Sequence, residues 1–164
     1  MAPGPSGKLL VHSRGSDLVM MNADGGQRTL LRPDIRNFNS MSSCGDRYLV
    51  FDSYEGNKLR LLRTDPDGSN PVRLSDDVSV SDCSADGEWV LYRSGNKMYR
   101  LSIEGGAPAE VAGLTAGGTE AISPDGKWIA YTYQEGSPVP APKMAVIPAC
   151  DCTGRPIRRA FNTS

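Results

Sequence analysis

Histidine is nearly absent from the sequence, as are long apolar runs and any excess of charge of one sign. The single histidine, His12, would have to serve in any Ser-His-Asp triad, and no Gly-x-Ser-x-Gly elbow supplies a nucleophile. No apolar run approaches the roughly 18 residues of a transmembrane helix, so we expect no membrane insertion. Lys and Arg number 18 against 19 Asp and Glu, a balance that argues against a nucleic-acid partner.

The N-terminus also lacks the features of a secretory leader. The stretch Met1–Pro5 has neither a basic region nor an apolar core, so we expect no signal peptide. The sequence is rich instead in turn residues, with 18 glycines and 12 prolines spread between short apolar runs. Turn residues spread in this way indicate many tight turns and not disorder.

A repeat runs through the whole chain. The segments Gly45–Phe51, Asp86–Tyr92 and Asp125–Tyr131 each place a large apolar or aromatic residue and further apolar residues directly after a turn. A weaker copy, Gly7–His12, opens the chain, and the aligned turns recur at intervals of 39, 41 and 39 residues. A second apolar run, a Gly-containing turn and a short final strand follow each copy, and a further strand such as Val78–Cys83 precedes three of them. Each unit is therefore predicted to be a four-stranded antiparallel meander.

The apolar runs within the units are nearly continuous, which predicts strands that are covered on both faces. Sheets stacked face to face around an axis provide such cover, and a four-stranded repeat of about 40 residues has the period of a propeller blade. We therefore predict an all-β fold, a β-propeller of about four blades in a single domain spanning residues 1–164. The blades are expected at approximately 7–34, 35–76, 77–114 and 115–164.

At these residues the sequence resembles a known family. The segment Ser123–Tyr131 resembles the PD40 (TolB-like, WD40-like) propeller repeat, Ser84–Trp89 is a second copy, and Asp65–Ser75 is similar to the later half of that repeat. The run Met41–Phe161 is similar to the C-terminal propeller of bacterial receptor-type serine/threonine kinases and related sensor regulators. In that family the propeller is the sensing or interaction half. The Gly-rich, His-Arg-Asp and Asp-Phe-Gly motifs of the kinase half do not occur in this sequence.

The resemblance implies a non-catalytic protein-interaction or ligand-sensing module, and we expect no enzyme activity and no cofactor. Two alternatives stay open. The first is an accessory or specificity domain of a kinase or of a prolyl-peptidase-like enzyme, and the second is a self-assembling scaffold. The expected partner is a protein or a small ligand. In a receptor-type sensor the segment would lie outside the cytoplasm.

Four blades are few for a closed propeller of this type, and the first unit shows no clear inner strand. We therefore expect an open arc or a fragment of a larger propeller. The ends of an arc expose apolar blade faces, which predicts a homo-oligomer formed through the open blades. In a propeller the innermost strands line the axial channel, where ligands usually bind. The polar residues predicted to line that channel and to bind there are Asn37, Asn39, Ser81, Asp82, Thr119 and Glu120.

Four cysteines allow two disulfides or one zinc site. The repeat places Cys44 and Cys83 beside inner strands but Cys150 and Cys152 in an outer turn, too far apart for one shared site. A disulfide between Cys44 and Cys83 of neighbouring blades is one alternative, and free thiols are the expectation. We expect no metal site, because Asp65–Gly68 lacks the further oxygen ligands and the final Glu of an EF-hand loop.

Other conspicuous residues are explained by the repeat. Trp89 and Trp128 occupy the same column and are both predicted to be core residues of their blades. His12 falls in the column of Phe51 and is predicted to fill an aromatic slot. The proline-rich insertion Glu135–Pro142 is interpreted either as a surface loop or as a contact point for a partner.

Overall fold

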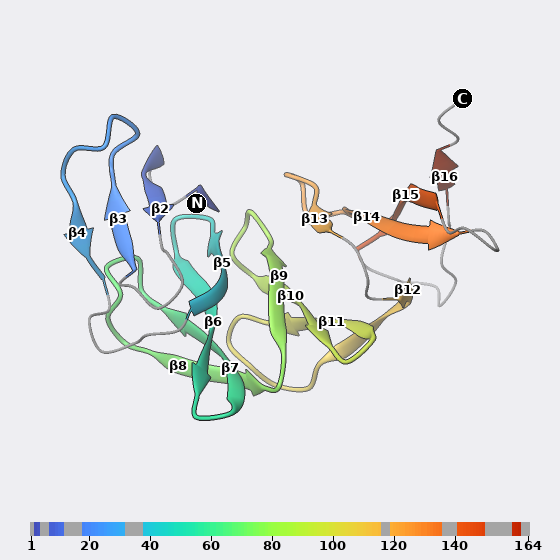
Figure 1. Ribbon diagram of the computed structural model, residues 1–164, viewed down its shortest axis with the longest axis horizontal. Helices are drawn as coiled ribbons and strands as arrows, with labels where there is room; N and C mark the ends of the chain where they lie inside the picture. The colour runs from blue at the N-terminus through green and yellow to red at the C-terminus, as the bar shows by residue number, and fades with distance from the viewer. Residues whose placement is uncertain are drawn as a thin grey trace.

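The chain forms four separate β-sheets, which follow one another along the sequence (Figure 1). The computed structural model describes residues 2–3, 7–11, 18–31, 38–115, 119–135, 141–149 and 159–161. Sheet 1 consists of β1 (Ala2–Pro3), β2 (Leu9–Val11), β3 (Val19–Met21) and β4 (Thr29–Leu30). Sheet 2 consists of β5 (Phe38–Cys44), β6 (Tyr48–Glu55), β7 (Lys58–Thr64) and β8 (Val72–Asp76).

Sheets 3 and 4 continue the same pattern. Sheet 3 consists of β9 (Ser79–Cys83), β10 (Trp89–Ser94), β11 (Lys97–Ser102) and β12 (Ala109–Thr115). Sheet 4 consists of β13 (Glu120–Ile122), β14 (Trp128–Glu135), β15 (Ala141–Pro148) and β16 (Arg159–Phe161). In every sheet consecutive strands are antiparallel neighbours. The predicted all-β architecture of four-stranded meanders is confirmed.

The four sheets form an open arc. Sheets 1 and 4 lie at opposite ends of the molecule, with sheets 2 and 3 between them (Figure 1). The sequence pattern gives the first unit no inner strand, yet β1 occupies that position, with Ala2 opposite Leu10 and Pro3 opposite Leu9. A proline is tolerated there because an edge strand leaves some N–H groups unpaired in any case. An Ala-Pro pair has little strand propensity, which is why the pattern missed it.

The core consists of apolar layers between successive sheets. In β10, Val90 and Tyr92 pack toward sheet 2, whereas Trp89 and Leu91 pack toward sheet 4, because neighbouring strand residues point to opposite faces. A sheet that lies between two others must therefore be apolar on both faces, which explains the continuous apolar runs. The layer between sheets 1 and 2 is built on Leu18, Leu31, Leu49 and Phe51.

A repeated turn precedes the second strand of sheets 3 and 4. The Ser84 hydroxyl donates to Asp86 Oδ1 at 2.6 Å and accepts the Trp89 N–H at 3.1 Å. Ser123 makes the equivalent two bonds in sheet 4, at 2.6 and 3.0 Å. These serine hydrogen bonds lower the pKa of the Asp86 and Asp125 carboxyls. The Ser-x-Asp-Gly part of the repeat is therefore a turn held by side-chain hydrogen bonds, and the next strand begins directly after it.

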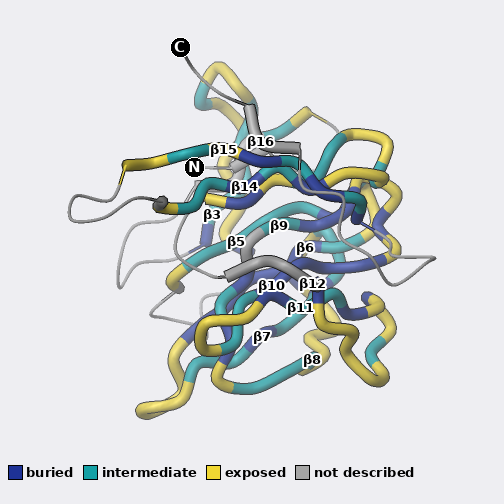
Figure 2. Tube along the Cα trace, turned by 90° about the vertical axis from the view of Figure 1, so that its right-hand side faces the viewer, coloured by how far each residue is buried: buried dark blue, intermediate teal, exposed yellow. Residues whose placement is uncertain are grey.

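Trp128 does not share the environment of Trp89. Trp89 is 4% exposed between sheets 3 and 4, whereas Trp128 is 41% exposed. Both side chains lie on the face away from the preceding sheet, but no sheet of the described residues follows sheet 4. Figure 2, which views the molecule from this end, shows intermediate and exposed stretches along β14 and β15. The prediction that both tryptophans are core residues is therefore wrong for Trp128.

Candidate functional site

Four of the six predicted channel residues belong to the first strands of sheets 2, 3 and 4. Strands β5 and β13 both lie beside β9. Asn39 is on β5, Asp82 is on β9, Glu120 begins β13 and Thr119 directly precedes it. Ser81 is on β9, where only its backbone is described, and Asn37 lies outside the described residues. We use the name inner-strand cluster for the polar residues that connect the inner strands in two hydrogen-bonded groups, namely Asn39, Asp52 and Ser79 in one and Ser42 and Asp82 in the other.

Asp82 joins three sheets. Its Oδ1 accepts the Ser42 hydroxyl of sheet 2 at 3.1 Å and the Cys83 N–H at 2.8 Å. Its Oδ2 accepts the Ile122 N–H of sheet 4 at 2.8 Å. One carboxylate therefore satisfies a backbone donor on the neighbouring inner strand, a group that would otherwise be an unpaired edge N–H.

Asp52 makes the same kind of connection from inside the core. It is fully buried on β6, accepts the Ser40 N–H of its own sheet, and accepts the Val80 N–H of sheet 3 at 3.1 Å. Asn39 Nδ2 lies 3.4 Å from Asp52 Oδ2 and 3.3 Å from Ser79 Oγ. Burial raises the pKa of the Asp52 carboxyl, although these hydrogen bonds oppose the rise. The sequence pattern does not predict Asp52 as a site residue. The one feature that could have indicated it is a carboxylate within an otherwise apolar strand.

Glu120 and Thr119 have opposite surroundings. Thr119 is exposed, and its backbone N–H donates to Thr132 Oγ1 at 2.9 Å. Glu120 is buried, and its Oε2 lies 3.5 Å from Arg93 Nη2 of sheet 3. Its Oε1 has no hydrogen-bond partner among the described residues. Glu120 therefore lies between sheets 3 and 4 and not on an open polar surface.

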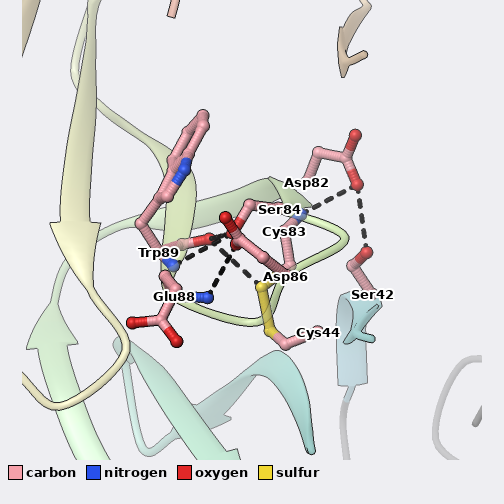
Figure 3. Close-up of a disulfide and its surroundings, with 8 residues drawn as sticks. All are labelled: Ser42, Cys44, Asp82, Cys83, Ser84, Asp86, Glu88 and Trp89. Atoms are coloured by element: carbon pink, nitrogen blue, oxygen red, sulfur yellow. Dashed lines mark hydrogen bonds between the residues drawn. A yellow bond between two sulfur atoms is a disulfide. The ribbon is translucent and has the colours of Figure 1, made fainter. Parts of the chain in front are cut away.

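A disulfide joins the inner strands of sheets 2 and 3 (Figure 3). Cys44 ends β5 and Cys83 ends β9, and their Cα atoms lie 5.1 Å apart, within the range that a disulfide spans. The expectation of free thiols is wrong for this pair, because the ends of neighbouring inner strands converge more closely than the repeat alone indicates. Cys150 and Cys152 lie outside the described residues.

The turns beside the disulfide are in close contact. A Cβ on Gly87 would lie 2.8 Å from the Cys44 carbonyl oxygen, and one on Gly45 would lie 2.6 Å from the Ala85 carbonyl oxygen. Both glycines also have positive φ, at 72° and 56°, a conformation that a Cβ disfavours. Figure 3 shows the disulfide between the Ser84–Trp89 turn and the end of β5. Sheets 2 and 3 are thus joined by a covalent bond, by backbone contact and by the inner-strand cluster.

Charged residues near the turns connect the same two sheets. Arg63 of β7 donates to Glu104 at 2.8 Å, and its guanidinium lies 4.4 Å from the Tyr48 ring centre. The Tyr48 hydroxyl also donates to Glu104, at 3.1 Å, and Arg47 pairs with Glu88. Ion pairs whose carboxylate is exposed, as in both of these, contribute little stability individually, so we assign the main connection to the disulfide and the core.

The site offers hydrogen-bonding groups held in fixed positions. Asn39 and Thr119 are exposed, and amide and hydroxyl groups can both donate to and accept from a ligand. In the described part of the chain, no group of three or more His, Cys, Asp and Glu side chains is placed to hold a metal ion. The described residues also contain no helix with the length and apolar character of a membrane span.

Three solved structures are similar to the chain. TolB from Acinetobacter baumannii matches with a TM-score of 0.72 and 15% identity over 93% of this chain and 39% of that chain. The tricorn protease matches with a TM-score of 0.67 and 15% identity over 90% of this chain and 15% of that chain. A nidogen/laminin complex matches with a TM-score of 0.62 and 13% identity over 87% of this chain and 56% of that chain.

These matches show the fold. The four sheets form part of a TolB-like β-propeller, and the chain spans less than two thirds of each of these three proteins. At such low identity the likeness carries no activity from one protein to another. The sequence matches no family model and no curated protein.

Proposed function

We propose that the chain is a non-catalytic interaction or ligand-sensing module, which binds a protein or a small ligand at the inner strands of its propeller arc. The observation that supports this proposal most directly is the inner-strand cluster. Asp52 and Asp82 fix the inner strands of sheets 2, 3 and 4 relative to one another. Preorganised polar groups bind a partner without the entropy cost of ordering them first.

The exposed members of this region are the proposed contact groups. Asn39 and Thr119 are exposed and lie on or next to inner strands, while Asp52 and Glu120 are buried and are assigned a supporting role. The fold is consistent with binding, since propellers of the TolB-like kind place their inner strands around a channel. The similarity of Met41–Phe161 to the propellers of receptor-type kinases favours sensing as the form that binding takes.

Site-directed photo-crosslinking tests this proposal. A photoreactive residue placed at Thr119 should capture a discrete partner from an extract of the organism that makes the chain. The matched control carries the same residue at Asn57, which is also exposed but lies in the β6–β7 turn. Capture at Thr119 and not at Asn57 supports the proposal. Equal capture at both positions, or hydrolase or kinase activity of the purified chain, contradicts it.

One comparison favours a second candidate function. The tricorn protease is an enzyme in which the matched segment is 15% of the chain, so a propeller of this kind can be part of a much larger catalytic protein. An accessory or specificity domain would be indicated by a catalytic domain in the same reading frame. It would also predict that cleaving the two apart changes substrate selection and leaves the turnover of a small substrate unchanged.

A further inference from the structure

Sheets 1 and 4 each have one apolar face that no described element covers. In sheet 4 this is the face opposite Ile129 and Ala145, which pack against sheet 3. Strand pairing places Trp128 opposite Pro148, Ala130 opposite Val146 and Thr132 opposite Met144 on that face. Trp128 is 41% exposed and Met144 is 52% exposed. No position of β14 or β15 on this face is charged, and the set is Trp128, Ala130, Thr132, Gln134, Pro142, Met144, Val146 and Pro148.

The uncovered face of sheet 1 is apolar as well. Leu18 and Met20 pack against sheet 2, so Val19 and Met21 point to the other side of the sheet. Leu30 lies opposite Val19 and is 46% exposed. Sheets 1 and 4 lie at opposite ends of the arc (Figure 1), so these two faces cannot cover each other within one chain.

The internal junctions show what such faces pack against. Trp128 and Met144 occupy the positions that Trp89 and Met98 occupy in sheet 3, where the two residues are 4% and 0% exposed. In sheet 3 they are covered by the face of sheet 4 that carries Ile129 and Ala145, which is the face toward the preceding sheet. The equivalent face of sheet 1, on the side away from sheet 2, carries Val19, Met21 and Leu30.

We propose that the outward face of sheet 4 docks onto the outward face of sheet 1 in a second copy of this chain, continuing the internal stacking of the sheets. Each copy brings one face of each kind, so the contact is head-to-tail. Two such contacts between two copies make a closed ring, and contacts that do not close make a filament. Burying the uncharged side chains of β14 and β15 makes this docking favourable, because it removes apolar surface from water. Arg159 of the edge strand β16, which is paired with Val146, is the one charged strand position on this face of sheet 4 among the described residues.

Sedimentation velocity on the full 164-residue chain tests the proposal when it is combined with two charge-insertion variants. Trp128→Glu disables the face of sheet 4, and Leu30→Glu disables the face of sheet 1. Both positions are exposed in the single chain, so both variants should fold, which circular dichroism and thermal melting confirm. The wild-type chain should associate as its concentration is raised, while each variant alone should stay monomeric.

Mixing the two variants identifies the pairing. Trp128→Glu keeps an intact sheet 1 face and Leu30→Glu keeps an intact sheet 4 face, so an equimolar mixture should form a dimer with a single interface. Iodide quenching of Trp128, measured in a Trp89→Phe background, should fall as the chain associates. A wild-type chain that stays monomeric at high concentration overturns the proposal. Association of Leu30→Glu alone also overturns it, because the contact would then pair like faces.

Discussion

Sheets 3 and 4 carry the same motif and form the same turn, yet the residues after that turn have different surroundings. Ser84 and Ser123 make equivalent hydrogen bonds, and each turn leads into a strand that begins with tryptophan. Trp89 is 4% exposed and Trp128 is 41% exposed. The difference shows that local sequence determines the turn and the strand, whereas burial of a repeat position depends on whether another sheet follows.

The largest effect predicted from this comparison is on folding stability. Trp89→Ala should lower the free energy of unfolding by about 3–5 kcal/mol, as expected for removal of a buried aromatic side chain. Trp128→Ala should lower it by about 1 kcal/mol or less in dilute solution, since that side chain is already partly in water. Urea unfolding followed by circular dichroism measures both. Equal losses would show that sheet 4 is covered in the single chain.

The second prediction concerns the junction of sheets 2 and 3, which the disulfide crosses. The disulfide closes a loop between cysteines 39 residues apart, which stabilises the folded chain by about 4 kcal/mol in the chain-entropy description. Adding a reductant should therefore lower the melting temperature of the wild-type chain. The Cys44→Ser/Cys83→Ser double variant should already melt at the lower temperature and should not respond to reductant. A response in that variant would assign the effect to Cys150 or Cys152.

Replacing an aspartate that connects two sheets should destabilise the chain more when that aspartate is more deeply buried. Asp52→Ala leaves the Ser40 and Val80 N–H groups without their acceptor in the core, which costs about 2–3 kcal/mol. Asp82→Ala should cost about 1–2 kcal/mol, because its partly buried surroundings let water replace the carboxylate. Chemical unfolding of both variants provides the test. A larger loss for Asp82→Ala would mean that the junction of sheets 3 and 4 depends more on its aspartate than burial indicates.

The two serines of the repeated turn provide a matched pair with a smaller effect. Ser84 is fully buried, whereas Ser123 is partly exposed, although both make the same bonds. Ser84→Ala should cost about 1–2 kcal/mol and Ser123→Ala about 0.5–1 kcal/mol. Thermal unfolding of the two variants under identical conditions decides the order. The reverse order would contradict the assignment of the more exposed turn to sheet 4.

The smallest effect is on the pH dependence of stability. Ser84 lowers the pKa of Asp86, so the stabilisation is present above the unfolded pKa of about 4 and is lost as the pH falls through the lower folded pKa. The advantage of wild type over Asp86→Asn should therefore shrink on acidification. The pH dependence of the Asp52 contribution has the opposite sign, because the pKa of Asp52 is raised in the folded chain. Its contribution to stability is present below the unfolded pKa and is lost as the pH rises through the folded pKa. Melting temperatures of wild type, Asp86→Asn and Asp52→Asn across acidic pH separate the two.

Much of the fold follows from local signals in the sequence. The strand predicted at Val78–Cys83 is β9, Ser79–Cys83, because turns that need glycine and runs of apolar residues both act over a few positions. The missed strand β1 has no such signal, since its pairing with β2 is made by two backbone residues with little strand propensity. Repeat period alone therefore finds units and turns but not a short edge strand.

The site was less predictable because its contacts join different sheets. Asp82 was identified from its place on an inner strand, but its bond to the Ile122 N–H depends on how sheets 3 and 4 are placed. The disulfide likewise depends on the close approach of two turns, which the contact of Gly87 with the Cys44 carbonyl shows. Asp52 has no distinctive sequence signal either, because its bond to the Val80 N–H also crosses the junction of sheets 2 and 3. The prediction that the inner strands bind a partner stays a prediction.

The two tryptophans are the only ones in the sequence, and they allow a direct measurement of the central comparison. Iodide quenching of fluorescence should be measured in Trp128→Phe, which reports on Trp89, and in Trp89→Phe, which reports on Trp128, in dilute solution. The open arc predicts weak quenching of Trp89 and strong quenching of Trp128. Equal quenching of the two in dilute, monomeric chains would contradict an arc whose last sheet has an uncovered face.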